Sequence, residues 1–425
     1  MNKTKWYAKS IYALVALALV LSLGIMAVPM AGTVEAGGTN YYVRTDGNDS
    51  NDGSANDAAH AWLTIQHAVD TVSSGDTVNV AAGTYTEDVA LNRNVSILGG
   101  SPKPILKATG TTTKKGALSF VGGTSTTPKR FEDMVIKDII IEYDGTTIDV
   151  PLMDAGYGYP VFDGVEFIGI EFIHNGTWRS PFIGGKVPIN FGFGYPSRVE
   201  GDGVLFKDCK MTNAGGCEDG AFMVWQAEGG GPTTFDNVII DGNGNYTEIN
   251  IYDGTGITVK NCHTMNNAYF YLSGLTDLTV ENNVFSGYGT FVNGVNGATI
   301  RDNVFENTRG LEFTAAWGPT QNYNVLVEEN TFQNIDTDAI KIHRYTASTP
   351  DSDFLDVHCN NFINIGEFAV NNTFDTFTVH AENNWWGDAS GPTHAGNPGG
   401  SGDTVSDNVD YDPWLLMEFQ YCPEC

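Results

Sequence analysis

The chain is 425 residues long and strongly acidic, with 22 Lys and Arg against 51 Asp and Glu and a formal net charge of −29 at pH 7. This charge argues against nucleic acid as a partner, because a phosphate backbone is bound through a basic footprint. It also argues against polyanionic substrates unless a cation bridges them, whereas metal cations and neutral sugars fit. Acidity alone can equally reflect the solubility of an extracellular protein.

The amino-terminal segment predicts a secretory signal peptide over residues 1–36. Three lysines precede an apolar run over residues 11–28, and the small-residue site Val34-Glu35-Ala36 follows. The run is nearly long enough to remain in a membrane as an uncleaved anchor, and that alternative stays open. After cleavage we expect a secreted or cell-surface protein without a membrane span, since no later segment is long and apolar enough.

The segment after this leader carries a candidate calcium loop. Asp46, Asn48, Ser50 and Asp52 alternate at the spacing of calcium ligands, and Asp57 stands at the twelfth position of the loop. An EF-hand needs Gly at its sixth position, where this chain has Asn. The alternative is an Asx-rich turn closed by its own backbone bonds. Calcium is therefore a candidate cofactor, and the sequence predicts no other.

A short amphipathic helix is predicted before the first strands. Trp62, Ile65, Val69 and Val72 recur at helical spacing and end near the turn residues 73–75. Terminal repeats must shield apolar ends and unpaired strand edges, so we expect this helix to cap a stack of strands. Residues 37–100 are interpreted as an amino-terminal cap with the first coils.

A six-residue phrase then recurs: an aliphatic residue, two variable residues, Asn, one variable residue and Phe. It occurs at residues 280–285, 300–305, 327–332 and 357–362, and degenerate copies extend it in both directions. The aliphatic or aromatic anchors of the copies are Ile136, Phe167, Phe206, Phe235, Val259, Val280, Ile300, Val327, Val357 and Val379. Such a recurrence indicates a solenoid with insertions in individual repeats.

Each repeat holds short apolar alternations broken by Gly, Asn or Asp, which predicts short strands joined by turns. A strand that returns one level up lies parallel to its predecessor, and parallel crossovers are almost always right-handed. We therefore predict an all-β fold, a right-handed parallel β-helix solenoid over residues 101–386. The Asn residues should stack at one corner, with Phe side chains filling the bore.

These repeats resemble the pectin-lyase-like superfamily of right-handed β-helix proteins. That superfamily includes carbohydrate-active enzymes, a periplasmic copper-protein-like group and many secreted or surface proteins. The segment Tyr41–Gly53 is similar to the usual start of such helices, and Asn383–Pro392 is similar to their usual end. Residues 387–425 are interpreted as a carboxyl-terminal cap with a Cys-containing tail. The signature motifs of the superfamily's hydrolases and alginate epimerases are absent, so the resemblance implies no single reaction.

Two pairs of cysteines are informative. Cys209 and Cys262 fall in the corner column two coils apart, about 10 Å at the usual strand spacing, which is too far for a disulfide. We expect buried thiols there. Cys422 and Cys425 favour a local or intermolecular disulfide over half of a zinc site, because no second pair of this spacing exists.

The strands that follow the repeated phrase place polar side chains on an outer face. Alternation sends Glu312 outward from one strand, and Lys341 and His343 outward from the corresponding strand of the next coil. These three residues are the candidate catalytic groups. Trp225, Tyr252, Tyr269 and Tyr271 are expected on the same face of earlier coils.

Two insertions follow these same strands, over residues 316–323 and 344–353. Loops on a rigid scaffold commonly carry binding groups, and aromatic faces bury the apolar faces of sugar rings. The predicted substrate-binding residues are Trp225, Tyr252, Tyr269, Tyr271, Trp317, Tyr323, Arg344 and Tyr345. The alternative is a solvated sheet face on which Glu312 and Lys341 form a weak surface ion pair.

Three functional hypotheses follow. The first is a secreted or cell-surface protein that binds extracellular polysaccharide without catalysis, in adhesion, envelope or scavenging. The second is a calcium-assisted polysaccharide lyase, in which Lys341 or His343 abstracts a ring proton and Arg344 or a metal neutralises the enolate. The third is a structural envelope or surface-layer component. Because all three use one fold, the fold does not choose between them.

Overall fold

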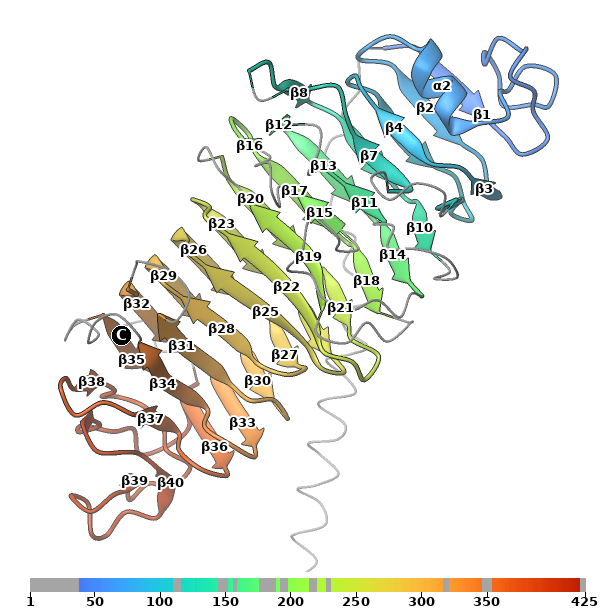
Figure 1. The fold of residues 1–425 in the computed structure, drawn as a ribbon. Helices are drawn as coiled ribbons and strands as arrows, with labels where there is room; N and C mark the ends of the chain where they lie inside the picture. Colours follow the sequence, from blue (N-terminus) through green and yellow to red (C-terminus); the bar gives the residue numbers. More distant parts are fainter. Residues whose placement is uncertain are drawn as a thin grey trace, which may run out of the picture. The chain divides into compact units, whose positions relative to one another are not determined.

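The computed structural model describes residues 38–109, 116–124, 126–143, 152–155, 159–175, 189–191, 198–213, 220–226, 231–315, 321–345 and 354–420 (Figure 1). For residues 189–191, 220–226 and 344–345 it describes the backbone only. The predicted signal peptide lies outside the described residues. None of the described helices is long and apolar enough to cross a membrane.

The described chain forms three long parallel sheets, here called A, B and C, and each successive coil contributes strands to them (Figure 1). Sheet A consists of β1 (Asn40–Val43), β2 (Thr77–Val80), β5 (Ser96–Gly99), β9 (Val135–Lys137), β13 (Val165–Ile168), β17 (Val204–Lys207), β20 (Thr233–Asp236), β23 (Ile257–Lys260), β26 (Thr276–Glu281), β29 (Asn296–Arg301), β32 (Tyr323–Glu328), β35 (Leu355–His358), β38 (Val379–His380) and β41 (Val409–Asp410).

Sheet B consists of β3 (Thr84–Thr86), β6 (Ile105–Lys107), β10 (Ile140–Tyr143), β14 (Glu171–His174), β18 (Lys210–Asn213), β21 (Ile239–Asp241), β24 (His263–Met265), β27 (Val284–Ser286), β30 (Val304–Glu306), β33 (Thr331–Ile335) and β36 (Asn361–Ile365). Sheet C consists of β4 (Val89–Leu91), β7 (Leu118–Phe120), β11 (Met153–Asp154), β15 (Ile189–Phe191), β19 (Gly220–Gln226), β22 (Thr247–Tyr252), β25 (Ala268–Ser273), β28 (Thr290–Asn293), β31 (Leu311–Ala315), β34 (Ile340–Tyr345) and β37 (Val370–Asn372).

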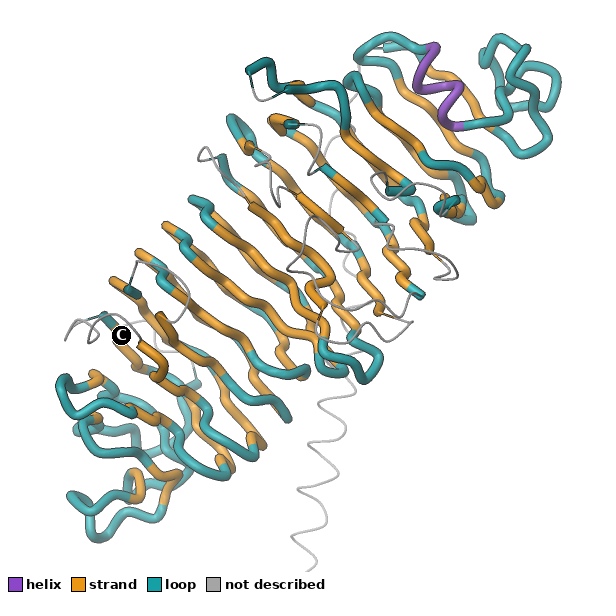
Figure 2. The backbone as a smooth tube through the Cα atoms, in the orientation of Figure 1, coloured by secondary structure: helices purple, strands orange, loops and turns teal. Residues whose placement is uncertain are grey.

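Two small sheets complete the strand content of the described residues. One contains β8 (Lys129–Glu132), β12 (Pro160–Asp163) and β16 (Arg198–Val199), and the other pairs β39 (Pro392–Thr393) with β40 (Gly402–Thr404). Figure 2 shows that strands make up most of the regular structure of the described residues. The all-β prediction is therefore confirmed.

The predicted repeat register is confirmed across sheet A for every anchor but the last. Each anchor pairs with the next one in parallel, from Ile136 with Phe167 through to Val327 with Val357. At the final coil Asp356 pairs with His380, which places Ala381 rather than Val379 opposite Val357. The assignment of Val379 as an anchor is therefore wrong. The final copy uses Ala and Trp in place of an aliphatic residue and Phe, so its pattern is harder to recognise.

The predicted corner column of asparagines is confirmed as a continuous hydrogen-bonded ladder. The Oδ1 atom of Asn303 accepts bonds from the backbone N–H and the Nδ2 of Asn283, at 3.0 and 2.9 Å. Its own Nδ2 donates to the backbone carbonyl of Val280 at 2.9 Å. The same pattern runs through Asn283, Asn303, Asn330, Asn360 and Asn384. Each amide therefore satisfies buried backbone groups and joins one coil to the next.

Aromatic rings stack in the bore beside this ladder. Phe285, Phe305, Phe332 and Phe362 are buried, and neighbouring ring centroids lie 4.8, 4.7 and 5.2 Å apart. Trp386 extends the stack, 4.9 Å from Phe362. The predicted inward Phe column is thus confirmed. Burial of these rings supplies much of the hydrophobic stabilisation of each coil.

The turn that enters the corner has a left-handed backbone conformation at the residue before the column. These positions have φ between 53° and 59° at Asp208, Asn237, Asn261, Asn282, Asp302, Glu329, Cys359 and Asn383. Asn and Asp tolerate this conformation better than other residues with a Cβ atom. The sequence therefore encodes the turn with the residue beside the column as well as with the column itself.

A helix, α2, spans Ile65–Thr71 and buries Ile65, Ala68 and Val69 (Figure 2). Its N-cap Thr64 accepts a hydrogen bond from the His67 backbone at 3.2 Å. The Glu87 carboxylate accepts bonds from the first two helical N–H groups, at 2.8 and 2.9 Å. These contacts fix the start of the helix. Its role as the cap of the stack stays a prediction.

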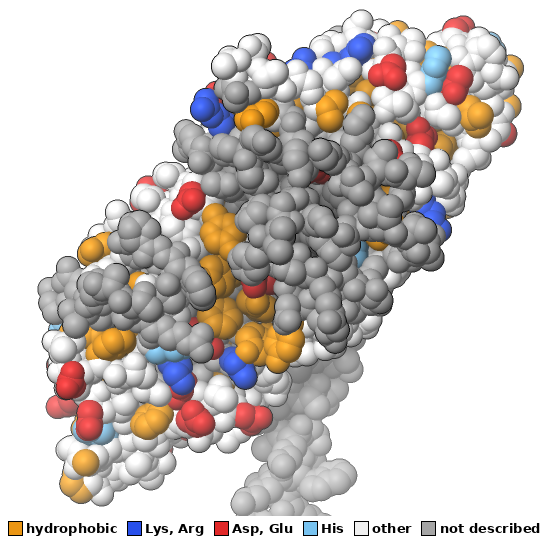
Figure 3. Space-filling model, viewed as in Figure 1, with side chains coloured by type: hydrophobic (Ala, Val, Ile, Leu, Met, Phe, Trp, Pro, Cys, Tyr) orange, Lys and Arg blue, Asp and Glu red, His pale blue; other side chains and the backbone are white. Residues whose placement is uncertain are grey.

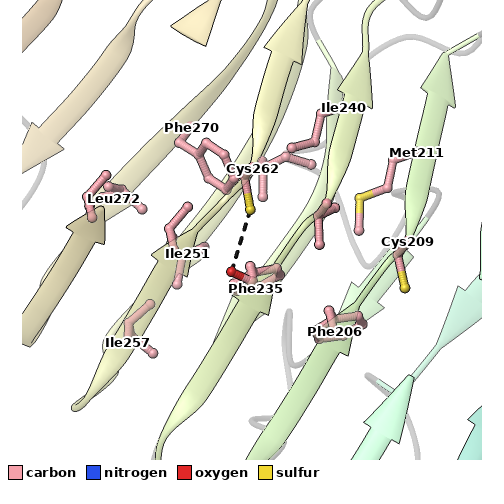
Figure 4. Packing of buried hydrophobic residues seen from close by; sticks show 14 of the residues in the cluster. Phe206, Cys209, Met211, Phe235, Ile240, Ile251, Ile257, Cys262, Phe270 and Leu272 are labelled. Atoms are coloured by element: carbon pink, nitrogen blue, oxygen red, sulfur yellow. Dashed lines mark hydrogen bonds between the residues drawn. The ribbon is translucent and has the colours of Figure 1, made fainter. Parts of the chain in front are cut away.

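Cysteine side chains occupy the corner in earlier coils. Cys209 and Cys262 are buried free thiols, and Figure 4 shows them among the apolar core residues. The sulfur of Cys262 donates to the Phe235 carbonyl at 3.5 Å. Burial raises the pKa of both thiols to about 12. The pair Cys422 and Cys425 lies outside the described residues.

Candidate functional site

A cleft of about 290 Å³ lies over β31 and β34, on the outer face of sheet C. Leu311, Phe313, Ile340 and Ile342 of these strands are fully buried, so the intervening side chains face outward. The cleft is lined by Arg309, Glu312, Thr337, Asp338, Lys341, His343 and Glu367. All three candidate catalytic residues therefore lie in one cleft.

Strand pairing explains how Glu312 and His343 meet. Glu312 pairs with Lys341 and Phe313 with Ile342. Two positions after Phe313, however, Ala315 pairs with Tyr345, so β34 carries one extra residue. Such a bulge re-aims the side chains beside it. His343 lies in this bulge, and its Nε2 is 2.7 Å from the Glu312 carboxylate.

Lys341 has a different partner from the one expected. Its Nζ donates to the Oδ2 of Asp338 at 2.6 Å, and Asn371 donates to the same oxygen at 3.0 Å. The predicted pair of Glu312 with Lys341 is therefore not the contact observed. Asp338 lies in the preceding turn and is almost completely buried, while Glu312 is only 9% exposed. The alternative of a solvated sheet face does not fit Glu312, which is buried and bonded to His343.

Aromatic side chains cover the same face of the earlier coils. We call Tyr246, Tyr252, Tyr269, Tyr271, Tyr288 and Phe291 the aromatic cluster. The ring of Phe291 lies 5.5 Å from Tyr269 and 6.0 Å from Tyr271. Figure 3 shows hydrophobic side chains gathered on this face next to basic, acidic and histidine side chains.

The aromatic cluster and the cleft form one continuous surface. Tyr271 pairs with Phe291, Phe291 pairs with Glu312, and Glu312 pairs with Lys341. Arg309 lines the cleft, and its guanidinium lies over the Tyr288 ring at 4.4 Å from the centroid. The arrangement therefore offers flat apolar rings beside polar groups that can donate and accept hydrogen bonds.

A carboxylate lies within the aromatic cluster. Glu248 accepts a hydrogen bond from the Tyr269 hydroxyl. Burial raises the pKa of Glu248, and burial together with the Glu248 charge raises the pKa of Tyr269 well above its usual range. The pKa of Tyr271 is raised to about 12 for the same two reasons. These tyrosine hydroxyls therefore remain neutral hydrogen-bonding groups at physiological pH.

Comparison with known proteins identifies the fold. A sequence model for the right-handed β-helix region matches residues 197–320. A mutant tailspike protein of E. coli bacteriophage HK620, solved with a pentasaccharide, has a TM-score of 0.50 at 13% identity and covers 78% of this chain. The chain folds as a right-handed parallel β-helix.

The tailspike alignment spans 64% of the tailspike chain, slightly less than two thirds of its length. Two further solved structures have lower TM-scores. The polygalacturonase from Erwinia carotovora ssp. carotovora has a TM-score of 0.47 at 12% identity, with 90% of this chain and 96% of that chain covered. The lacto-N-biosidase from Eubacterium ramulus has a TM-score of 0.45 at 12% identity, with 82% and 67% covered. No curated protein sequence matches the chain. At these identities the likeness establishes the fold alone.

The β-helix does not bring every predicted residue to the site. Tyr252, Tyr269 and Tyr271 lie in the aromatic cluster, but Tyr323 begins β32 of sheet A and does not line the cleft. Its placement at the rim is wrong, because the strand starts earlier than expected. Trp317 lies outside the described residues. The side chains of Trp225, Arg344 and Tyr345 also lie outside the described part, although their backbones belong to β19 and β34.

The candidate calcium residues form a chain of local turns. Asp46 accepts two bonds from the Arg44 guanidinium, at 2.8 and 3.1 Å. Asn48, Asp52 and Asp57 accept bonds from backbone and side-chain donors two or three residues later, and Ser50 is the donor to Asn48. This pattern is that of Asx turns. Calcium binding stays a prediction, and a higher melting temperature with calcium than with chelator, lost in Asp46→Ala, would support it.

Sequence reasoning missed several site residues. Phe291 lies one coil after Tyr271 in the same column, so alignment of the coils would have found it. Arg309, Thr337 and Glu367 belong to turns at the edge of sheet C, where strand alternation gives no direction for a side chain. Their positions depend on the tertiary path of each turn.

Proposed function

We propose that this protein binds a neutral extracellular polysaccharide on the outer face of sheet C, without catalysis. The observation that carries the proposal is the continuity of the aromatic cluster with the polar cleft. Sugar rings have apolar faces that stack on aromatic rings, and their hydroxyls bond to carboxylate, ammonium and imidazole groups. Flat rings and polar groups side by side therefore match both parts of a sugar.

Charge favours a neutral glycan over a polyuronate. Glu312, Asp338 and Glu367 face Arg309 and Lys341 in the cleft, and Glu248 adds a carboxyl group beneath the aromatic cluster. Among the described residues, Lys341 is already held by Asp338. A chain of uronic acids would thus meet more negative than positive groups, which costs affinity unless a cation bridges them. The structurally similar tailspike protein was solved in complex with a pentasaccharide, which supports a glycan as the partner.

Location and biological role form the wider part of the proposal. Residues 1–36 read as a leader that directs the mature chain outside the cell, where an acidic glycan-binding β-helix would act in adhesion, envelope or scavenging. A purely structural envelope role would leave the aromatic cluster without a ligand.

The test compares two tyrosines on different sheets. A glycan array with the full-length protein first identifies a ligand, and calorimetry then measures its affinity for wild type, Tyr271→Ala and Tyr323→Ala. Loss of a desolvated aromatic anchor usually costs more than about 1 kcal/mol, so Tyr271→Ala should weaken binding at least fivefold. Tyr323 is 38% exposed and lies on sheet A, so Tyr323→Ala should bind the glycan as tightly as wild type.

Melting temperatures for each variant separate lost contacts from lost folding. Tyr271→Phe keeps the ring and should retain most of the affinity if stacking matters more than the hydroxyl. An array without any bound glycan, or equal affinities for Tyr271→Ala and wild type, would favour the structural role instead.

One contact favours a second candidate, the calcium-assisted polysaccharide lyase. The 2.7 Å bond between Glu312 and His343 is the kind of contact that orients an imidazole for proton abstraction. Lys341 serves this chemistry less well, because a Lys that donates to a buried carboxylate is acting as an ammonium group. In a lyase, unsaturated products would absorb in the ultraviolet, and His343→Ala would abolish them while glycan binding persisted. Absence of such products from every bound polysaccharide would exclude this candidate.

A further inference from the structure

Three potential metal ligands meet at the carboxyl-terminal end of sheet A. His380, Glu382 and Asp410 each offer one ligand atom, and these atoms all lie within 4.8 Å of one another. The Nδ1 of His380 is 3.6 Å from the Glu382 carboxylate. His380 and Asp410 lie on β38 and β41 of sheet A and Glu382 lies in the turn after β38, whereas the proposed glycan surface lies on sheet C.

The fold holds these side chains on one outer face. His380 pairs in register with Asp410, and the Ala381 N–H donates to the Asp410 carbonyl at 2.8 Å. Val379 and Ala381 are buried, so His380 and Glu382 point away from the core. The positions of His380 and Asp410 are therefore set by the pairing of β38 with β41, and Glu382 lies in the turn directly after β38.

The donor set selects a particular class of ion. One imidazole nitrogen and two carboxylate oxygens are donors that zinc binds at about 2.0–2.2 Å, which places ligand atoms about 3.4 Å apart in a tetrahedral site. Small rotations of these side chains, of which His380 and Glu382 are half-buried and Asp410 is exposed, bridge the gap from the spacing observed. Two carboxylates also balance the charge of a divalent cation. Calcium, by contrast, takes oxygen ligands and gains nothing from the histidine.

We propose that His380, Glu382 and Asp410 bind a divalent transition-metal ion of the zinc type, which ties β41 to β38. β41 has only two residues, is the last strand of sheet A, and joins the sheet after the connection over residues 381–408. An ion bound by both strands would stabilise this end of the sheet, because it binds only where the two strands are already paired.

A neighbouring histidine provides a matched control. His358 lies on β35, one coil earlier in sheet A, with its Nε2 3.9 Å from the Glu328 carboxylate. It resembles His380 in exposure and in having one acidic neighbour. Among the described residues, however, it belongs to no group of three potential ligands.

The experiment measures zinc binding to the tag-free, full-length protein by calorimetry. Wild type should bind one zinc ion at this site, and His358→Ala should bind it equally well. His380→Ala and the nearly isosteric Asp410→Asn should each weaken binding at least about tenfold, since even outer-sphere partners of a metal site contribute that much. Zinc should also raise the melting temperature of wild type and His358→Ala, but not that of His380→Ala.

Three results would overturn the proposal. The first is the absence of zinc binding by wild type. The second is zinc binding that survives both His380→Ala and Asp410→Asn. The third is zinc binding that disappears in Cys422→Ser/Cys425→Ser and persists in His380→Ala, which would assign the ion to the tail. Circular dichroism of each variant confirms that lost binding is not lost folding.

Discussion

The corner between sheets A and B is built in two ways along the same chain. In the later coils Asn283, Asn303 and their successors form a ladder in which each amide bonds to two coils. In the earlier coils the same position holds Ile170, Cys209 or Val238, which offer at most a weak S–H donor. Both halves nevertheless turn the corner with the same left-handed residue before the column.

This difference shows that the feature that forms the turn is not the feature that holds neighbouring coils together. Because the backbone conformation is shared, the ladder is not needed to form the corner. What the ladder adds is a set of hydrogen bonds that satisfy buried backbone groups between coils. We therefore expect local unfolding to require a different free energy in the earlier coils than in the later coils, as parts of one structure commonly differ in local stability.

The largest expected effect tests the buried, stacked Phe rings, which the earlier and the later coils share. Phe206 and Phe305 are both fully buried and stacked, with ring neighbours at 4.8 and 5.1 Å for Phe206 and at 4.8 and 4.7 Å for Phe305. Truncation to Ala should cost about 3–5 kcal/mol of unfolding free energy at either site, through lost transfer energy and a cavity. Urea denaturation measures both. A much smaller cost at Phe206 would show that the halves differ in core packing as well as in the corner.

The next effect isolates the ladder. Asn303→Ala removes the acceptor of the Asn283 N–H and the donor to the Val280 carbonyl, both buried. Each unsatisfied group costs about 1–3 kcal/mol, so we expect a loss of about 2–4 kcal/mol. Cys209→Ala, at the same column in an earlier coil, should cost about 1 kcal/mol because it removes only a small apolar group. Equal losses at the two positions would contradict a special role for the ladder.

A third effect, acid sensitivity, is expected in the earlier half. His174 ends β14, is 2% exposed, and its Nδ1 has no hydrogen-bond partner among the described residues. Burial lowers its pKa to about 4. The unfolded chain, with a pKa near 6.5, binds the proton more readily, so the stability of the fold is full above that value and falls as pH drops toward 4.

This linkage amounts to about 2 kcal/mol between pH 7 and pH 5. His174→Leu should remove that part of the pH dependence. Denaturation curves at the two pH values provide the measurement. If the free energy of unfolding changed with pH as steeply in His174→Leu as in wild type, the acid-sensitive group would lie elsewhere.

The comparison also shows what the sequence could reveal. The spacing of Asn and Phe was sufficient to predict the register of sheet A, the ladder and the bore, because in-register stacking repeats one residue type at one position. It failed at Val379, where Ala381 and Trp386 replace the expected residue types. At the candidate site, alternation placed Glu312, Lys341 and His343 on one face. It could not predict that a bulge turns His343 toward Glu312 or that Asp338 reaches Lys341 from a turn.

The smallest expected effect comes from giving a later coil the residue that an earlier coil has directly before the column. Glu329 has φ +57° before the column, where Asn or Asp stands in most coils, and burial together with the charges of Asp302 and Glu328 raises its pKa. In the earlier half Asn237 occupies this position and donates from Nδ2 to Asp208 at 2.7 Å. Glu329→Asn relieves a conformation that non-Gly residues resist and supplies an amide next to Asp302.

We expect Glu329→Asn to stabilise the protein by about 0.5–1 kcal/mol, within the range of backbone-compatible substitutions in turns. The reverse change, Asn237→Glu, should destabilise it by a similar amount, because it introduces strain and charge repulsion beside Asp208. Urea midpoints for both variants, measured at the same pH and ionic strength, give the two values. If Glu329→Asn is neutral while Asn237→Glu is costly, the bond to Asp208 and not the backbone conformation governs the corner. The two halves would then differ in how the turn itself is held.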